Sequence, residues 1–174
     1  QGNPLMQVLE TQRLVLREIE AADAPFILEL LTDPSFLDNI GDRGVSDMAS
    51  AANYIENSPR ASYARNGYGL WLVVSRETGE PFGMAGLVRR DTLPDADIGY
   101  AFLPRHWSKG YAVEACTAVR DHAMRTLAMP RLLAIVSPGN VASVKVLQRI
   151  GLTFRDTVRL GADDLQLFAI EASA

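Results

Sequence analysis

Residues 96–112 decide the fold, and they read ADIGYAFLPRHWSKGYA. The first part alternates in the manner of a strand, with Ile98, Tyr100 and Phe102 on one face and the residues between them on the other. Pro104 ends the strand, because proline has no N–H to donate to a neighbouring strand. The stretch therefore predicts a strand over 97–102 that is followed at once by a turn.

The turn after this strand contains Gly110 and leads into a helix. The first N–H groups of a helix have no partner inside it, and the helix dipole there favours negative charge. Gly110 lets a ligand come close to the main chain, and Lys109 adds a positive charge. Pyrophosphate is a natural ligand for such a turn, although a lone glycine turn would more often serve close packing only. The following helix has apolar residues at helical spacing, namely Ala115, Cys116, Val119, Ala123 and Leu127.

The composition is that of an ordinary globular protein. The chain has 174 residues, of which 48% are hydrophobic and 22% are charged, which is enough for one domain with a core. The formal net charge of −4 argues against a nucleic-acid-binding protein, which would be basic. No apolar run in the sequence is long enough to span a membrane. We therefore expect neither a nucleic acid nor a membrane as a partner, and a homodimer is left open.

The rare residue types exclude further classes of site. Cys116 is the only cysteine, so no internal disulfide can form, and a reducing, cytoplasmic location is expected. Its apolar surroundings favour a buried hydrophobe over a nucleophile. With two histidines and no His/Cys cluster, we expect no metal site. Residues 1–5 precede the first methionine and are expected to be an expression remnant outside the fold.

Hydrophobic periodicity predicts a single mixed α/β (α+β) domain over residues 6–174, with about seven strands and four helices. Residues 37–45, which contain two glycines, are expected to form a loop. Strands are expected at 11–18, 68–75, 81–89, 97–102, 132–136, 152–160 and 165–171. Helices are expected at 24–32, 47–65, 108–128 and 140–150, the second capped by Ser46 and interrupted at Pro59.

A second group of residues, 140–154, reads NVASVKVLQRIGLTF. Asn140 is a preferred helix N-cap, Ser143 lies in the first turn, and Gly151 is a natural left-handed end for the helix. By itself this pattern indicates only a well-capped helix. Together with the strand, turn and helix that begin at residue 96, it completes an ordered set of motifs.

The ordered motifs resemble those of the GNAT superfamily of N-acetyltransferases, specifically its RimJ/RimL-type branch, named for ribosomal-protein N-terminal acetyltransferases. Four stretches carry the resemblance: TQRLVLR at 11–17, DIGY at 97–100, WSKGYAVEA at 107–115, and residues 140–151 with Phe154. The resemblance implies a mixed, mostly antiparallel sheet that is splayed between its fourth and fifth strands. It also implies acetyl-CoA as the co-substrate, bound in that gap.

The resemblance implies roles for individual residues as well. Main-chain groups of Phe102 and Leu103 would bind the pantetheine arm, and the amides of the glycine turn would hold the pyrophosphate. Two residues of the last helix, Asn140 and Ser143, would lie beside the thiol end. The implied cofactor-binding residues are Phe102, Leu103, Ser108, Lys109, Gly110, Tyr111, Ala112, Asn140 and Ser143.

Three positions depart from the superfamily pattern. Trp107 stands where Gln or Arg is usual, and Leu147 stands where many relatives have a tyrosine that protonates the thiolate. Both are typical of the RimJ/RimL-type branch. Asp97 stands where many relatives have a glutamate base, and we assign it that role, directly or through water. Ser143 is assigned the thiolate role. The alternatives are a solvated strand-edge carboxylate for Asp97 and helix capping alone for Ser143.

These features predict an N-acetyltransferase that moves an acetyl group to a primary amine by direct attack in a ternary complex. The acceptor groove is expected at residues 33–66 and 159–164. A peptide α-amino group is favoured, with a polyamine, an amino acid or an antibiotic amine as alternatives. A catalytically idle acyl-CoA-binding or regulatory domain is a further alternative, and a nucleotide-binding module is a weaker one because no Walker or paired-glycine motif is present. The residues considered for the groove are Asp38, Asn39, Asp42, Tyr54 and Tyr63.

Overall fold

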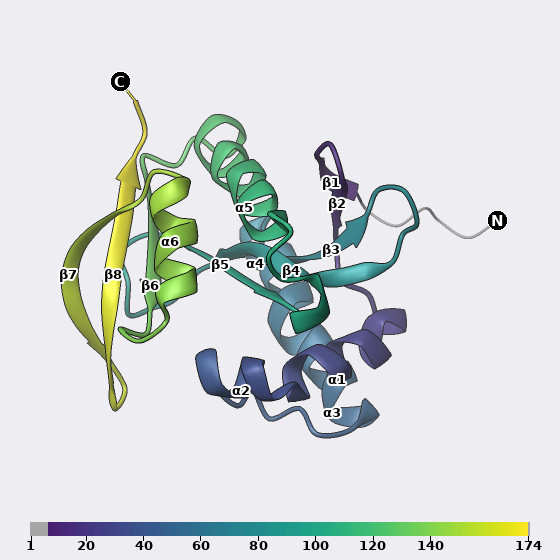
Figure 1. Cartoon of the computed structure of the whole chain (residues 1–174). Coiled ribbons are helices and arrows are strands. Elements are labelled where there is room, and N and C mark those ends of the chain that lie inside the picture. The colour runs from purple at the N-terminus through teal and green to yellow at the C-terminus, as the bar shows by residue number, and fades with distance from the viewer. Residues whose placement is uncertain (1–6, 174) are drawn as a thin grey trace.

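The computed structural model describes residues 7–173 and shows one eight-stranded mixed sheet with helices on both faces (Figure 1). The strands follow one another across the sheet in the order β1-β2-β3-β4-β5-β6-β8-β7. Their bounds are β1 Gln7–Glu10, β2 Leu14–Arg17, β3 Leu70–Ser75, β4 Pro81–Val88, β5 Asp97–Phe102, β6 Arg131–Val136, β7 Thr153–Leu160 and β8 Asp163–Glu171. The predicted mixed α/β class is confirmed.

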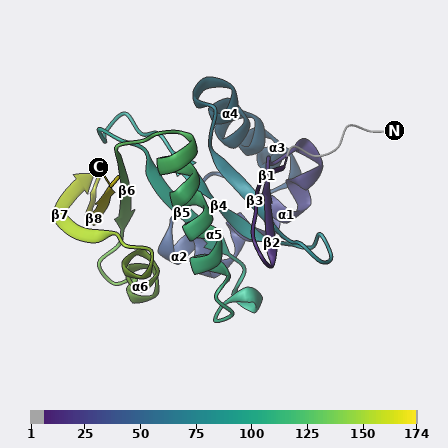
Figure 2. The ribbon, with the colours of Figure 1, turned by 90° about the horizontal axis from the view of Figure 1, so that it is seen from above.

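Two large hydrophobic cores lie on opposite faces of the sheet, and Figure 2 shows the helices on the two faces. The first packs α5 and α6 against strand residues that include Leu14 and Leu16. The second packs α1 and α3 against strand residues such as Leu72 and Ala101. The helical segments are η1 Ala21–Asp23, α1 Ala24–Thr32, α2 Pro34–Asn39, α3 Met48–Ile55, η2 Glu56–Arg60, α4 Ala61–Asn66, η3 Pro104–His106, α5 Tyr111–Asp121, η4 His122–Thr126 and α6 Val141–Arg149.

The sheet splays between β5 and β6, the strands predicted as fourth and fifth. These two strands run parallel and pair only where Asp97 lies opposite Leu133, with the Leu133 N–H donating to the Ala96 carbonyl at 3.0 Å. Every other neighbouring pair is antiparallel and longer. Beyond residue 97, β5 therefore has an open edge toward β6.

Several boundaries differ from the sequence expectations for local reasons. Strand β1 was not predicted, and the expectation about residues 1–5 lies outside the described residues. Helix α2 occupies part of the expected loop 37–45, because Asp33 caps it by accepting the Ser35 N–H at 2.9 Å. The cap of α3 is Asp47 rather than Ser46, in a reciprocal capping box with Ser50.

The helix expected from residue 108 begins three residues later, at Tyr111, because Ser108 and Gly110 both have positive φ angles, 62° and 82°. Such backbone cannot continue a right-handed helix. Pro59 lies inside the wide turn η2, after which α4 continues to Asn66. Within residues 7–173, no helix has the length and apolar character needed to cross a membrane.

Candidate functional site

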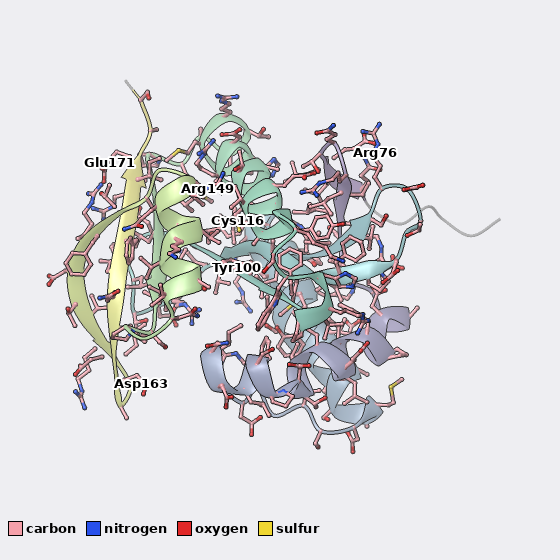
Figure 3. All side chains as sticks on the ribbon, viewed as in Figure 1. Arg76, Tyr100, Cys116, Arg149, Asp163 and Glu171 are labelled. Atoms are coloured by element: carbon pink, nitrogen blue, oxygen red, sulfur yellow. The ribbon has the colours of Figure 1, made fainter. Side chains whose placement is uncertain are left out.

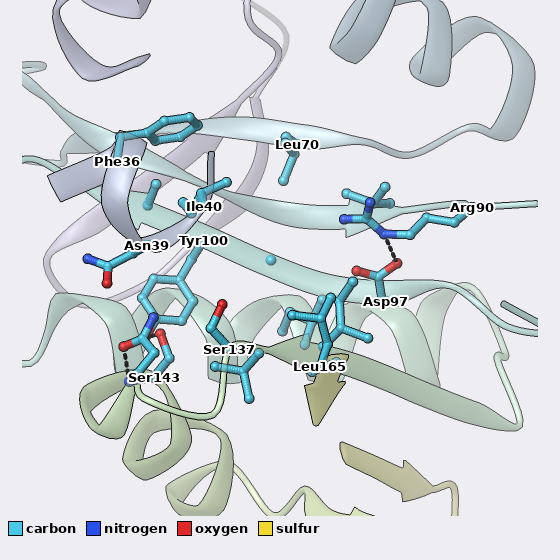
Figure 4. Close-up of a pocket in the computed structure, with 18 of the residues that line it drawn as sticks. Phe36, Asn39, Ile40, Leu70, Arg90, Asp97, Tyr100, Ser137, Ser143 and Leu165 are labelled. Carbon is cyan, nitrogen blue, oxygen red and sulfur yellow. Dashed lines mark hydrogen bonds and ion pairs between the residues drawn. The ribbon is translucent and has the colours of Figure 1, made fainter. Parts of the chain in front are cut away.

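A cavity of about 390 Å³ opens where β5 and β6 part (Figure 4). Strand β5 forms one wall, and the segment from the end of β6 into α6 forms another. The α2–α3 region, the tip of the β7–β8 hairpin, residues of β3 and β4, and Arg90 also line the cavity. Polar or charged lining residues include Asn39, Arg43, Tyr54, Arg90, Asp97, Tyr100, Ser137, Asn140, Ser143 and Asp163.

The glycine turn at the start of α5 presents a row of free main-chain donors. In residues 7–173, no protein acceptor takes the N–H groups of residues 108–112. Ser108 is held with a positive φ of 62°, a conformation that costs free energy and is concentrated at functional sites. Successive N–H groups in such a turn, at a helix N-terminus, form an anion-binding site. The turn therefore suits a phosphate group.

Glycine is favoured at position 110 for two reasons. Its φ of 82° is left-handed, and a Cβ built there would lie 3.3 Å from Nη2 of Arg13. Arg13 also stacks over the Tyr111 ring, with its guanidinium carbon 4.5 Å from the ring centroid. A side chain at 110 would thus displace Arg13 and intrude on the anion site.

Glu114 ties the first turn of α5 to the β1–β2 connection. Its carboxylate accepts hydrogen bonds from the Thr11 hydroxyl at 2.5 Å, the Arg13 N–H at 2.9 Å and Arg13 Nε at 2.7 Å. Burial disfavours the charged carboxylate, but these hydrogen bonds outweigh it and lower the pKa of Glu114. In this structure Glu114 has a structural role that fixes the helix start.

The open edge of β5 presents main-chain groups of alternate residues to the gap. Leu103 N–H donates to the Phe82 carbonyl at 3.2 Å, so Leu103 faces β4, and Phe102 and Tyr100 face the gap. The Leu103 carbonyl in turn accepts from the His106 N–H at 2.9 Å. The N–H and the carbonyl of Leu103 each make one hydrogen bond within the protein. A pantetheine contact at Leu103 stays a prediction.

Phe102 is only half free, because its carbonyl accepts from Trp107 Nε1 at 2.8 Å. The indole therefore anchors the glycine turn to the end of β5. The Phe102 N–H remains directed toward the gap. Sequence reasoning noted Trp107 as a departure from the family pattern but did not foresee this contact.

Tyr100 and Ser143 meet across the gap, with Tyr100 Oη and Ser143 Oγ 3.0 Å apart. Asn140 Oδ1 accepts the Ser143 main-chain N–H at 3.2 Å, which confirms Asn140 as the N-cap of α6 (Figure 4). Helix capping uses the Ser143 N–H and leaves its hydroxyl for Tyr100. Burial raises the pKa of Tyr100 to about 12. Sequence reasoning assigned Tyr100 only to a strand face.

Asp97 is buried and paired with an arginine. Only 2% of its surface is exposed, so the alternative of a solvated strand-edge carboxylate is wrong. Arg90 Nε donates to Asp97 Oδ1 at 3.0 Å (Figure 4). Burial raises the pKa of Asp97 to about 6, and Arg90 opposes that rise. Sequence reasoning missed Arg90, although a carboxylate between apolar strand residues signals the need for a partner.

Some of the residues predicted for the acceptor groove line the cavity, and their role stays a prediction. Asn39 and Tyr54 line the cavity. The hydroxyl of Tyr63 instead binds the main chain of Ile19 and Leu70, a structural contact. Asp38 and Asp42 are not among the described residues that line the cavity.

Cys116 lies within the first core, on α5 (Figure 3). Burial raises the pKa of its thiol to about 12, so the thiolate does not form near neutral pH. Cys116 is therefore a small buried hydrophobe, as predicted.

Comparison with known proteins identifies the family. Residues 13–153 match the model of the acetyltransferase (GNAT) domain. The chain belongs to the GNAT acetyltransferase family. YkkB of Bacillus subtilis is 32% identical over 156 residues, covering 87% of this chain and 88% of that protein. The N-acetyltransferase p20 of Bacillus licheniformis is 30% identical over 146 residues, covering 83% and 82%. The protein is thus an N-acetyltransferase.

Solved GNAT structures share the fold. An acetyltransferase from Agrobacterium tumefaciens superimposes with a TM-score of 0.82 at 29% identity, covering 98% of this chain and 99% of that chain. RimL, the ribosomal L7/L12 α-N-protein acetyltransferase, solved with coenzyme A, has a TM-score of 0.80 at 18% identity, covering 95% and 98%. The second likeness concerns the fold alone.

Proposed function

We propose that this GNAT protein transfers the acetyl group of acetyl-CoA to a primary amine, favouring a peptide α-amino group, by direct attack in a ternary complex. One observation carries the proposal: the cavity that the splayed strands open contains both a buried carboxylate, Asp97, and a hydroxyl pair, Tyr100 and Ser143. The free amides at the start of α5 belong to the same strand–turn–helix unit, which begins with β5.

The residues present fit acetyl-CoA. The pyrophosphate is assigned to the N–H groups of Ser108, Lys109, Gly110, Tyr111 and Ala112, and the pantetheine arm to main-chain groups of Phe102 and Tyr100. Asn140 and Ser143 are assigned to the thiol end. The bound co-substrate supplies an already activated thioester, so the protein has only to position the reactants and move protons.

Asp97 is proposed as the base for the amine. With a pKa of about 6 it is ionised at neutral pH and can accept a proton. An α-ammonium group has a reference pKa of about 8, so proton transfer from it to Asp97 is uphill by about 2 pKa units, or roughly 2.7 kcal/mol. The lysine ammonium group has a reference pKa of about 10.4, so its proton transfer to Asp97 would be uphill by more than 4 pKa units, or roughly 6 kcal/mol. This difference favours an α-amino acceptor.

Ser143 is proposed to donate a hydrogen bond to the departing thiolate, with Tyr100 donating to Ser143 Oγ. A thiol has a reference pKa of about 8.5, whereas that of Tyr100 is about 12. Full proton transfer from Tyr100 would therefore be uphill by more than 3 units, or roughly 5 kcal/mol. Tyr100 thus orients the Ser143 hydroxyl and remains protonated.

A thiol-release assay tests the proposal. Acetyl-CoA is offered with short peptides bearing free N-termini, with the same peptides N-blocked but containing lysine, and with polyamines or aminoglycosides. We expect release with the free N-termini. Release confined to polyamines or aminoglycosides would contradict the peptide acceptor, and silence across the panel with acetyl-CoA bound would favour the idle binding domain.

A further inference from the structure

Arg90 presents an unused binding edge to the acceptor cavity. Its Nε is engaged by Asp97, and in the part of the chain that the structure describes no acceptor takes either Nη group. Figure 4 shows the Arg90 guanidinium beside Asp97 at one end of the cavity. An arginine held at Nε keeps its outer fork available, and that fork matches the two oxygens of a carboxylate.

Arg43 adds a second guanidinium from a different part of the chain. It lies between α2 and α3, lines the same cavity, and is exposed. Its positive charge acts on Tyr54, another lining residue. Within residues 7–173, Arg43 makes no ion pair or hydrogen bond with protein groups that would occupy its charge.

The charges of the cavity suit a molecule that carries both signs. Among its described lining residues, the arginines Arg43 and Arg90 stand with two aspartates, Asp97 and Asp163. Asp163 is exposed at the tip of the β7–β8 hairpin (Figure 3). A polycationic acceptor would bring further positive charge against the arginines, which is unfavourable.

We propose that the acceptor is a zwitterionic amine, whose amino group faces Asp97 and whose carboxylate is bound by Arg90 and Arg43. This inference rests on the proposed amine acetylation and narrows its substrate class. The carboxylate is either the α-carboxylate of a free amino acid or an acidic side chain near a peptide N-terminus. The two sources share the same chemistry and are separated by experiment.

The experiment measures kcat/KM for matched acceptors in the thiol-release assay. One pair is serine and serinamide, and the other is two peptides that differ only in Glu or Gln at the second position. We expect wild type to prefer the carboxylate member of at least one pair by about tenfold or more, as charge-assisted hydrogen bonds predict. The pair that shows the preference identifies the source of the carboxylate.

Variants assign the preference to the arginines. Arg43→Gln and Arg90→Gln should each bring the ratio of kcat/KM within the pair toward one. The ratio cancels any change in the basicity of Asp97, because both members undergo the same chemical step. Arg90→Lys should keep a charge beside Asp97 and retain only part of the preference. Arg125→Gln, an exposed residue outside the cavity, is the matched control and should keep the full ratio.

Three results would overturn the inference although acetyl transfer still takes place. The first is a wild-type ratio of one or less in both pairs, and the second is a ratio unchanged in both glutamine variants. Acetylation of spermidine alone is the third, and it would leave the amine acetyltransferase function standing. Silence with every acceptor would overturn the proposed function and this inference together.

Discussion

The two ends of β5 work by different means. At its C-terminal end, the proposed binding groups are main-chain amides of residues 108–112, held by Gly110 and by the anchor from Trp107. At its N-terminal end, the working groups are side chains, Asp97 with Arg90. The comparison teaches that this protein is proposed to bind its co-substrate through the shape of its backbone, and to select and activate its acceptor through side-chain chemistry.

The C-terminal end of β5 with the turn that follows it is called the backbone end. Substitution there should have the largest effect. Gly110→Glu places a negative side chain at a left-handed position against Arg13, so the rise in melting temperature caused by acetyl-CoA should vanish. Gly79→Glu is the matched control, because Gly79 has a similar φ of 77° and open space around it. A folded Gly110→Glu protein that still responds to acetyl-CoA would remove the pyrophosphate assignment.

The N-terminal end of β5, with Asp97 and Arg90, is called the side-chain end. Substitution of Asp97 there should leave acetyl-CoA binding intact and lower kcat. Asp97→Asn should lower kcat by about 10²- to 10⁴-fold while the acetyl-CoA effect on melting temperature persists. In wild type, kcat/KM should rise as pH increases through about 6, because Asp97 must be ionised to accept a proton. The same profile in Asp97→Asn, with unchanged kcat, would show that another group is the base.

The hydroxyl pair should give a smaller effect. Ser143→Ala should lower kcat by about 10- to 100-fold, because it removes a hydrogen bond to a charged thiolate. Tyr100→Phe removes a neutral bond and should cost about threefold to tenfold. Tyr68→Phe, which removes a phenol outside the cavity, is the control. Loss of acetyl-CoA affinity with kcat unchanged would show that the hydrogen bond between Tyr100 and Ser143 only holds β5 and α6 together.

Much of the backbone end could be predicted from the sequence. The strand, its proline end, the glycine turn and the apolar helix are consecutive in the chain, so local pattern predicts them without knowledge of distant residues. The helix start at 111 was misplaced because the left-handed backbone of Ser108 is set by its tertiary surroundings, and a serine does not signal it.

The side-chain end could be predicted only in part. Asp97 was found through its motif, but its burial and the partner Arg90 depend on how two strands pair. Arg43 reaches the cavity through folding of the α2–α3 region, which local pattern described as a loop. Tyr100 was correctly placed on a strand face, yet its contact with Ser143 joins segments 43 residues apart.

The smallest effect should come from loss of the ion pair between Glu114 and Arg13, which fixes the start of α5. Glu114→Gln removes the ion pair with half-exposed Arg13 and should cost about 1 kcal/mol or less of unfolding free energy. The pKa of Glu114 is lowered from its ordinary 4.5, so this stabilisation is present above that pH and is lost as pH falls through the folded pKa. Denaturant unfolding of both proteins at pH 7 and pH 3 should show a smaller difference at pH 3 than at pH 7, because pH 3 lies below the ordinary pKa of 4.5. An equal difference at both would contradict the ionic role.

The central claim is direct acetyl transfer to an α-amino group within one cavity, and single-turnover mass spectrometry tests it most directly. Enzyme is mixed with one equivalent of acetyl-CoA and an excess of a peptide that has both a free N-terminus and an internal lysine. The account predicts that the acetyl group appears on the peptide α-amino group at the rate of thiol release, while the mass of the enzyme never changes. An acetylated enzyme that forms and decays during the turnover, or acetylation of the lysine alone, would contradict it.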